Sequence, residues 1–414
     1  MQAIVGVIAL LALAIGLGRN RQRISPRLVL MALLLQLVLA ALLLRVTWIS
    51  EALLWLNHLV TAVEQATLAG SSFVFGYLGG ESPPFSVADP NYMYLFAFRV
   101  LPQVLVFSVL VAIAWYLGLL PWIVRQLGRL LRRTLGLTGP VATAAGASIF
   151  LGMVETPLVV RAYLRELTAE EIFTVMTCGM ATVAGSIMVL YAGVLAGVLD
   201  GALGHILSAS MINVIGAILM AHLLRPSNPQ TPTVTSNATQ TLRYSSLMDA
   251  INQGTADGLR LAVNVGAMVL VFVSLVALVN QLVGLVSVAD SPLSLQRILG
   301  WGFAPIAWLI GIPWSEAQTA GSLLGTKLII NELVAYLDLA ALPVEALSER
   351  SRLIMLYALC GFANFGSLGI LLAGLTTLVP ERRLEILQSA PWTLVSGTLA
   401  TCLTGCVVSL VTSL

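Results

Sequence analysis

The strongest constraint on this chain is a series of apolar runs, each about as long as a lipid bilayer is thick. A membrane-spanning helix needs ~20 mostly apolar residues, and runs near that length lie at 2–18, 28–49, 92–118, 172–199, 203–224, 262–286, 353–379 and 386–412. Only 10% of the 414 residues are charged, and the mean hydropathy of +0.95 excludes a soluble domain with a solvated surface. We therefore expect an all-α integral membrane protein with eight transmembrane helices in a lipid bilayer.

The basic residues fall mostly on one side of this arrangement. If the first run crosses from outside to inside, the arginines within 19–27, 125–133, 161–165, 225–260 and 382–383 share a side. Positive charge is enriched in cytoplasmic loops, so we predict a multi-pass protein of the cell inner membrane with periplasmic N- and C-termini. The net charge of +2 is too small to indicate a nucleic-acid-binding surface.

Two further apolar regions, 138–165 and 299–339, are interrupted by Gly, Pro and polar residues. Irregular backbone at membrane depth is tolerated only where protein or a water-filled cavity surrounds it. We therefore interpret both regions as re-entrant hairpins close to a site. Three amphipathic segments, 50–80, 120–136 and 244–260, are predicted to be interfacial helices.

The hairpins belong to a pattern that occurs twice. Glu155 and Glu332 are each followed by an Ala-Tyr-Leu sequence, and the Gly-rich run at 178–186 resembles the one at 360–367. Three predicted spans separate the copies, so the second copy enters the membrane from the opposite side. Broken helices in inverted repeats are typical of secondary transporters, whose sites lie near the midplane. The alternative is chance similarity between Gly- and Ala-rich helices.

This pattern divides the chain into two parts. Residues 1–137 are predicted to form a scaffold of N-terminal spans and interfacial helices. Residues 138–414 are predicted to form a transport core of two inverted repeats. In the first repeat, hairpin 138–165 accompanies span 172–199, and in the second, hairpin 299–339 accompanies span 353–379.

Glu155 and Glu332 are the candidate functional groups, because a carboxylate at mid-bilayer costs ~2.5–3.5 kcal/mol and calls for a partner or a function. One alternative is that Lys327 only neutralises Glu332, but this leaves Glu155 unexplained. The Gly-rich breaks would free backbone carbonyls, and Asn364 and Ser367 suit a hydroxylated sugar. Alternatively, these two polar residues only join neighbouring helices.

The chain resembles the concentrative nucleoside transporter family. The motifs that carry the resemblance are Gly-Leu-Arg-Leu-Ala-Val-Asn-Val-Gly-Ala-Met at 258–268, Gly-Ser-Leu-Leu-Gly-Thr-Lys at 321–327, Asn-Glu-Leu-Val-Ala-Tyr at 331–336 and Cys-Gly-Phe-Ala-Asn-Phe-Gly-Ser at 360–367. The likeness covers roughly 138 to 410, with only general topology before that. It implies a homotrimer in which a mobile domain carries both hairpins.

The resemblance also implies roles for individual residues. Glu332, Asn364 and Ser367 match the positions that bind the ribose hydroxyls. In the first hairpin, where the family has Gln, then Thr or Ser, then Glu, this chain has Met153, Val154 and Glu155. Two polar contacts to the base are therefore replaced by apolar surface, and the family's base preference does not transfer.

The family's sodium site corresponds to Ser148, Leu151, Thr182 and Val183. Ser148 stands where sodium-coupled members have Asn, as in the proton-coupled bacterial members. Because desolvation favours the protonated form of a carboxylate, we expect Glu155 to carry a coupling proton, with sodium as the alternative cation. No cofactor is expected.

We predict that the chain is not an enzyme but takes up nucleosides by cation-coupled symport. The alternatives within transport are sodium coupling and a nucleoside-like or nucleobase substrate. A membrane enzyme would need a site built from His58, His205, His222 and the buried acids, but these histidines are isolated in the sequence. A channel would need a continuous polar stripe, whereas the polar residues cluster where the predicted repeats meet.

Overall fold

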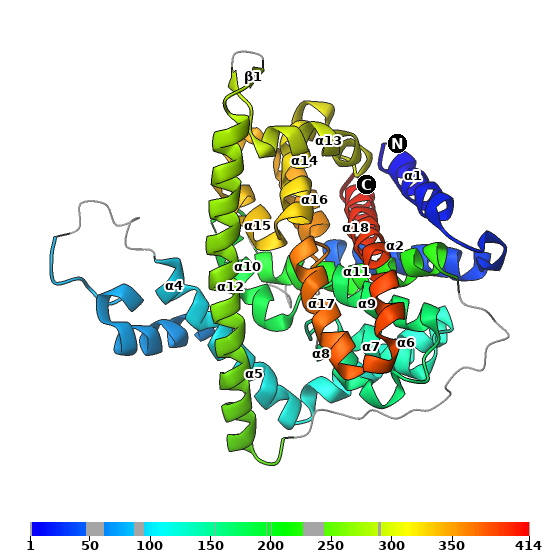
Figure 1. Ribbon diagram of the computed structural model, residues 1–414, viewed down its shortest axis with the longest axis horizontal. Coiled ribbons are helices and arrows are strands. Elements are labelled where there is room, and N and C mark those ends of the chain that lie inside the picture. Colours follow the sequence, from blue (N-terminus) through cyan, green and yellow to red (C-terminus); the bar gives the residue numbers. More distant parts are fainter. Residues whose placement is uncertain are drawn as a thin grey trace.

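The computed structural model describes residues 2–46, 62–86, 95–153, 155–195, 197–199, 201–226, 244–288 and 291–413. Within these ranges the chain is almost entirely helical (Figure 1), which confirms the predicted all-α class. The elements are α1 (Gln2–Leu17), η1 (Arg21–Arg23), α2 (Pro26–Arg45), η2 (Gly76–Gly79), α4 (Phe96–Arg99), α5 (Leu101–Tyr116), α6 (Leu119–Leu135), α7 (Gly139–Ala147), α8 (Glu155–Val159), η4 (Arg161–Tyr163), α9 (Ala169–Ala181), α10 (Gly185–Leu195), α11 (Ala202–Leu224), α12 (Leu247–Val283), β1 (Ser287–Val288), β2 (Ser291–Pro292), α13 (Leu295–Leu309), α14 (Trp314–Ile329), α15 (Glu332–Ala341), η5 (Val344–Ala346), α16 (Glu349–Leu359), α17 (Phe365–Leu378), η6 (Pro380–Arg382) and α18 (Arg383–Ser413). The two short strands pair in an antiparallel hairpin beyond the end of α12.

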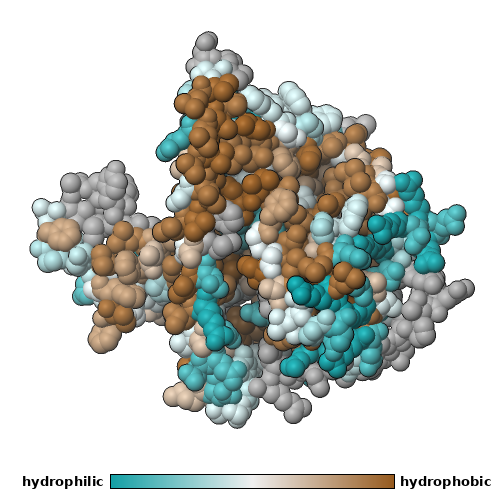
Figure 2. Space-filling model, viewed as in Figure 1, coloured by the Kyte–Doolittle hydropathy of each residue, from teal (hydrophilic) through white to brown (hydrophobic). Residues whose placement is uncertain are grey.

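Several helices are long and apolar enough to cross a membrane. Among the described residues these are Pro26–Arg45, Phe96–Tyr116, Ala169–Leu195, Ala202–Leu224, Leu247–Val283 and Pro380–Ser413, and α1 and α17 are shorter apolar helices. The helices α9, α11 and α18 contact one another and are buried inside the bundle. By contrast, the apolar part of α12 is largely unburied, and its upper half presents an apolar surface, as a lipid-facing helix would, whereas its lower half is hydrophilic (Figures 1 and 2).

The prediction of a separate interfacial helix at 244–260 is wrong. The segment is the first part of α12, which continues unbroken into the predicted span. Small residues at every fourth position, namely Ala250, Gly254, Gly258 and Ala262, form its buried stripe. A Cβ atom on Gly254 or Gly258 would come within 2.9 Å of an α5 Cα atom, so glycine permits the close packing that joins the helices.

The other two segments predicted to be interfacial helices, 120–136 and 50–80, are helical where the structure describes them. The segment predicted at 120–136 forms α6, whose buried face includes Leu120, Val124 and Leu131 while its arginines are exposed. Of the segment predicted at 50–80, the structure describes only the part from residue 62. This part is helical to residue 75 and continues into η2.

Both predicted hairpin regions contain a break, but the second region is more complex than predicted. In the first region, α7 ends at Ala147 and α8 begins at Glu155. The 299–339 region contains three helices instead of two. Gly311, at φ 106°, and Pro313 make a corner of 116° between α13 and α14. A second break at Ile330 and Asn331 then leads from α14 into α15, so the hairpin that bears Glu332 consists of α14 and α15.

The predicted breaks in the helices that follow the hairpins are present. Residues 182–184 separate α9 from α10, and residues 360–364 separate α16 from α17. The two breaks are in contact, because the backbone N–H of Phe362 donates to the carbonyl of Thr182 over 3.2 Å. A second hydrogen bond, from the N–H of Gly185 to the carbonyl of Phe150 over 2.8 Å, connects the first hairpin to the first break. The first hairpin turn and the two helix breaks therefore meet in one region.

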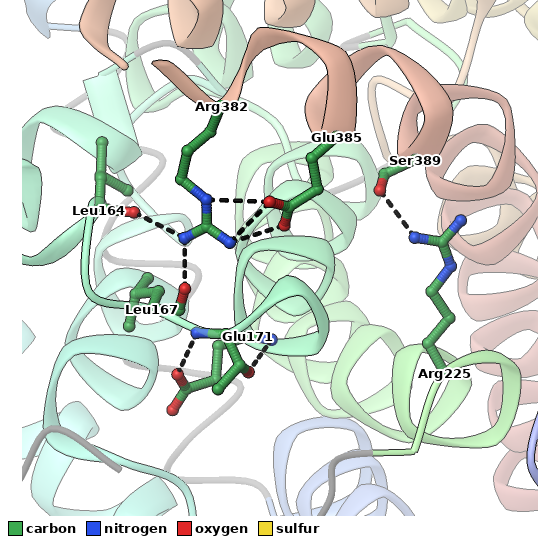
Figure 3. A network of polar contacts seen from close by, with 8 residues as sticks. Leu164, Leu167, Glu171, Arg225, Arg382, Glu385 and Ser389 are labelled. Carbon is green, nitrogen blue, oxygen red and sulfur yellow. Dashed lines mark hydrogen bonds and ion pairs between the residues drawn. The ribbon is translucent and has the colours of Figure 1, made fainter. Parts of the chain in front are cut away.

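Two arginines far apart in sequence, Arg225 and Arg382, lie at the end of the molecule where α18 begins. Arg382 donates to the carbonyls of Leu164 and Leu167 and pairs with Glu385 at 2.7 Å (Figure 3). Nearby, Arg225 donates to Ser389 over 2.7 Å. The two chain termini lie together at the opposite end of α18 (Figure 1). This common side for arginines far apart in sequence agrees with the predicted charge asymmetry; which side faces the cytoplasm stays a prediction.

Candidate functional site

A cavity of about 520 Å³ lies where the hairpins and the broken helices meet. This volume is within the ~300–1,000 Å³ of small-molecule sites. Its lining comes from the first hairpin turn, α10, α12, the turn between α14 and α15, and the break between α16 and α17. The lining residues that carry polar side chains are Glu155, Tyr191, Asn264, Asn331, Glu332, Asn364 and Ser367.

Glu332 is the first residue of α15 and is held by its neighbours. Asn331 caps this helix through a hydrogen bond from the N–H of Val334 to its side-chain oxygen over 2.9 Å. The Glu332 side chain is 4% exposed. The Tyr191 hydroxyl donates to its Oε1 atom, and the Asn364 amide donates to its Oε2 atom over 2.7 Å. Each carboxylate oxygen therefore has a donor from a different helix.

The orientation of Asn364 follows from its place at the start of α17. Its Oδ1 atom accepts a hydrogen bond from the N–H of Ser367 over 2.7 Å, which leaves Nδ2 to face Glu332. The Ser367 hydroxyl lines the cavity and makes no hydrogen bond within the described part of the chain. The structure thus brings together Glu332, Asn364 and Ser367, the three residues predicted to bind ribose.

Glu155 lines the same cavity from the opposite hairpin. It is the first residue of α8, and its Oε2 atom accepts a hydrogen bond from the N–H of Gly152 over 2.9 Å. The side chain is exposed to the cavity and forms no ion pair with any described residue. The two carboxylates, far apart in sequence, therefore share one space but have different surroundings.

The predicted base contacts are only partly described. Met153 lines the cavity at 7% exposure, and its backbone packs against Gly179, where a Cβ would lie 3.2 Å from the Met153 Cα. Val154 lies outside the described residues. Phe362, in the break before α17, adds a second apolar wall. Met153 and Phe362 therefore give the cavity apolar surface beside Glu155, and the assignment of this surface to the base stays a prediction.

The residues predicted to hold sodium, unlike Glu155, are buried and do not line the cavity. They are Ser148, Leu151, Thr182 and Val183. The Ser148 hydroxyl donates to the carbonyl of Ala145 over 2.8 Å, and the Thr182 hydroxyl donates to that of Cys178 over 2.9 Å. Both hydroxyls are therefore directed at their own helices, and the Thr182 carbonyl already accepts the N–H of Phe362.

Lys327 is not the ion-pair partner of Glu332. The residue is 2% exposed, and its ammonium group donates to the carbonyl of Ala358 and to the hydroxyl of Thr401, each over 2.8 Å. It lies near the end of α16, where a helix leaves carbonyls unsatisfied and a positive charge is favourable. Lys327 therefore makes no direct ion pair with Glu332, although the two groups lie close enough to interact electrostatically.

The two histidines that the structure describes, His205 and His222, do not share a site. His205 hydrogen-bonds the Tyr357 hydroxyl over 3.1 Å, and His222 accepts from the N–H of Ser25 over 2.9 Å. His58 lies outside the described residues. No group of three or more His, Cys, Asp or Glu side chains arranged to hold a metal occurs among the residues that the structure covers.

Sequence reasoning missed Tyr191, Phe362 and Asn264 as lining residues. Tyr191 is an isolated phenol in the apolar helix α10, and the one general signal is that a buried tyrosine hydroxyl usually has a hydrogen-bond partner. Phe362 and Asn264 lie inside motifs that the sequence singled out for other reasons. Only their positions around the cavity distinguish them from packing residues.

The family model for the C-terminal region of sodium-dependent nucleoside transporters matches residues 205–409, the corresponding N-terminal model matches 5–78, and a nucleoside recognition model matches 97–197. The nucleoside permease NupC of Helicobacter pylori is 34% identical over 96% of this chain and 94% of its own length. The putative nucleoside permease NupX of Escherichia coli is 35% identical over 97% of this chain and 96% of its own length.

Solved structures give the same result for the fold. The chain is similar to CNTnw in an inward-facing substrate-bound state, with a TM-score of 0.88 and 36% identity over 99% of this chain and 98% of that one. A variant of CNTnw in an outward-facing state has a TM-score of 0.89 and 35% identity over 100% of this chain and 97% of that one. The likeness therefore extends over the whole chain and to more than one state of that protein.

Proposed function

Because the chain belongs to the concentrative nucleoside transporter family, whose members are transporters and not enzymes, we propose that it takes up nucleosides across the cell inner membrane by cation-coupled symport. The observation that carries the proposal is the group Glu332, Asn364 and Ser367 on the wall of the central cavity. An ionised carboxylate accepts hydrogen bonds at both oxygens. Glu332 therefore suits the vicinal hydroxyls of ribose, while Ser367 offers a further hydroxyl.

The base occupies the apolar side of the cavity in this proposal. Met153 and Phe362 provide the surface there, with Val154 assigned to the same contact from the sequence. An apolar pocket discriminates weakly between substrates that differ by a polar group, whereas a polar pocket rejects the wrong one strongly. We therefore propose that the chain accepts several bases and selects mainly for the sugar.

Transport in this proposal follows alternating access. The core of residues 138–414 carries both hairpins, while residues 1–137 belong to the scaffold and contribute to a homotrimer. Structures of CNTnw in inward- and outward-facing states support the movement. The termini are assigned to the periplasmic side, because the arginines gather at the other end of α18.

We propose a proton as the coupling ion, carried by Glu155. Two observations support this choice: Glu155 is open to the cavity without an ion-pair partner among the described residues, and the Ser148 and Thr182 hydroxyls are directed at carbonyls of their own helices. The alternative is sodium, favoured by the description of the matching family as sodium dependent. Under that alternative, Ser148, Leu151, Thr182 and Val183 would supply oxygen ligands.

The test is uptake of labelled uridine and adenosine into proteoliposomes. One set carries an inward pH gradient in sodium-free buffer, and the other carries a sodium gradient at equal pH on both sides. Accumulation with the pH gradient, abolished by a protonophore, is the expected result. Accumulation with sodium alone would overturn the proton assignment but keep the transport function, and no accumulation under either gradient would contradict coupled uptake of these nucleosides.

A further inference from the structure

Tyr191 has no role in the function proposed above, although it touches the central carboxylate. It lies on α10 within an apolar sequence and is 1% exposed. Its hydroxyl donates to Oε1 of Glu332. Burying a phenol at this depth is favourable only when its polar end has a partner, and here that partner is the group assigned to the sugar.

Tyr191 and Asn364 hold the two carboxylate oxygens separately. Tyr191 comes from α10, after the first helix break, and Asn364 starts α17, after the second break. The Asn364 amide cannot turn without breaking the hydrogen bond that its Oδ1 atom accepts from the N–H of Ser367. Rotation of the carboxylate group would break both bonds at once, so this pair fixes the plane of the carboxylate.

The fixed plane determines what the carboxylate can bind next. An ionised carboxylate has roughly four acceptor positions, two on each oxygen. With one position on each oxygen already used, each oxygen keeps one for a ligand. Two hydroxyl donors on adjacent carbons, as in ribose, match two acceptors on adjacent oxygens, whereas a deoxyribose leaves one acceptor unpaired.

We propose that Tyr191 is a positioning residue that orients the Glu332 carboxylate toward a vicinal diol and thereby sets the preference for ribonucleosides over deoxyribonucleosides. This inference rests on the proposed ribose role of Glu332. It gives Tyr191 a part in specificity without a part in binding the base.

The packing of Tyr191 distinguishes this role from competition with the substrate. Its ring lies 4.9 Å from that of Tyr336, with an angle of 47° between the rings, and Tyr336 is itself fully buried. A residue that blocked the carboxylate in the empty protein would have to move away when the nucleoside arrived. Tyr191 is enclosed, so it keeps its hydrogen bond while the sugar binds.

The experiment compares Tyr191→Phe with Tyr336→Phe in the purified full chain. Each change removes one phenol oxygen from the same ring pair, but the Tyr336 hydroxyl donates to the carbonyl of Leu356 over 2.8 Å and touches no carboxylate. Calorimetry measures the Kd of uridine and adenosine and of their 2'-deoxy and 3'-deoxy forms. Melting temperatures report whether both variants are folded.

Tyr191→Phe should raise the Kd of the ribonucleosides ~10-fold, since hydrogen bonds to charged groups are strong, and that of the deoxy forms much less. The ratio of the deoxynucleoside Kd to the ribonucleoside Kd should therefore fall, because a carboxylate that can rotate still binds a single hydroxyl as well as before. Tyr336→Phe should leave the ratio unchanged. Incorporating 4-aminophenylalanine at position 191 restores a donor at the same place and should recover most of the wild-type Kd ratio. This variant also keeps the inference testable if Tyr191→Phe does not fold.

Three other outcomes are decisive. An unchanged ratio in Tyr191→Phe, with binding still lost in Glu332→Gln, would overturn the role of Tyr191 and leave the proposed function intact. Tighter binding in Tyr191→Phe would identify the phenol as a competitor and would likewise overturn the inference. Normal ribonucleoside binding in Glu332→Gln would contradict the ribose assignment on which the inference rests.

Discussion

The two hairpins each place a glutamate at the first residue of their second helix, yet the two side chains are held very differently. Glu332 is 4% exposed, and its oxygens accept hydrogen bonds from Tyr191 and Asn364 on two other helices. Glu155 is open to the cavity and accepts one hydrogen bond, from Gly152 of its own hairpin. The same residue type at equivalent places is therefore held by two other helices in one hairpin and only by its own hairpin in the other.

The hairpins also differ in how they are anchored. Lys327, on the first arm of the second hairpin, donates to Ala358 and Thr401 deep inside the bundle. The segment that follows the first hairpin is instead held at the arginine-rich end, where Arg382 donates to the carbonyls of Leu164 and Leu167 (Figure 3). A fixed carboxylate suits recognition of a defined ligand. An open carboxylate can change its protonation state or its hydrogen-bond partners during the transport cycle.

The largest effect is expected from Glu332→Gln, which should reduce ribonucleoside uptake at least ~100-fold. An amide cannot accept two hydroxyls as a carboxylate does, and it leaves the buried donors of Tyr191 and Asn364 poorly paired, at ~1–3 kcal/mol for each. Uptake into proteoliposomes measures the change. Glu345→Gln, at an exposed position in η5, is the control and should behave as wild type. Uptake at the wild-type rate in Glu332→Gln would remove the ribose assignment.

Glu155→Gln should separate coupling from binding. Without an ionisable group at the open position, accumulation driven by a pH gradient should fall ~10-fold or more, whereas exchange of internal for external nucleoside should persist, because the fixed site is intact. Both are measured in the same proteoliposomes. If exchange were lost together with accumulation, Glu155 would belong to the binding site as much as Glu332 does, and the contrast between the hairpins would be wrong.

A smaller effect is expected from restoring polarity at the first hairpin turn with Met153→Gln and Val154→Thr. The ranking of purine and pyrimidine nucleosides should change by ~3- to 10-fold, since new hydrogen-bonding groups discriminate between bases where apolar surface does not. The preference for ribose over deoxyribose should stay the same. Competition of unlabelled nucleosides against uridine uptake gives the ranking. The same ranking as in wild type would show that these positions do not face the base.

The smallest effect on transport is expected at the arginine-rich end. Arg382→Met removes the donor to Leu164 and Leu167 and should destabilise the protein by ~1–3 kcal/mol through the unpaired carbonyls, seen as a lower melting temperature. Nucleoside selectivity should not change, because the site is elsewhere. Arg383→Met is the matched control, because Arg383 is the next residue in the chain and its side chain is exposed. Equal melting temperatures for the two variants would show that Arg382 does not anchor this segment.

Much of the fold followed from the sequence for a direct reason. In a bilayer, backbone polar groups must be satisfied within helices, so apolar runs at 172–199 or 203–224 predict helices with little competition from other structures. The same rule identified the breaks at 182–184 and 360–364, because Gly-rich sequence at membrane depth weakens a helix. The rule gave the wrong result at 244–260, because the polar residues there indicated an interfacial helix. The segment instead belongs to α12, which packs on α5 through its stripe of small residues.

The candidate site was accessible from sequence only in part. Glu155, Glu332, Asn364 and Ser367 stood out because polar residues in apolar segments are rare and costly. Tyr191 did not, since a tyrosine is common as an apolar packing residue. Its importance depends on the hydrogen bond to Glu332, which lies 141 residues away in the chain.

The sequence by itself determined that this chain is an all-helical membrane protein with two interrupted, carboxylate-bearing regions. Composition and periodicity are properties of each segment, and the bilayer acts on each segment separately. Only the tertiary structure decided that the two glutamates line one cavity, that Lys327 pairs with a helix end and not with Glu332, and that one carboxylate is fixed while the other is open. Those facts depend on which helices touch, and contacts between distant segments leave no pattern in either segment alone.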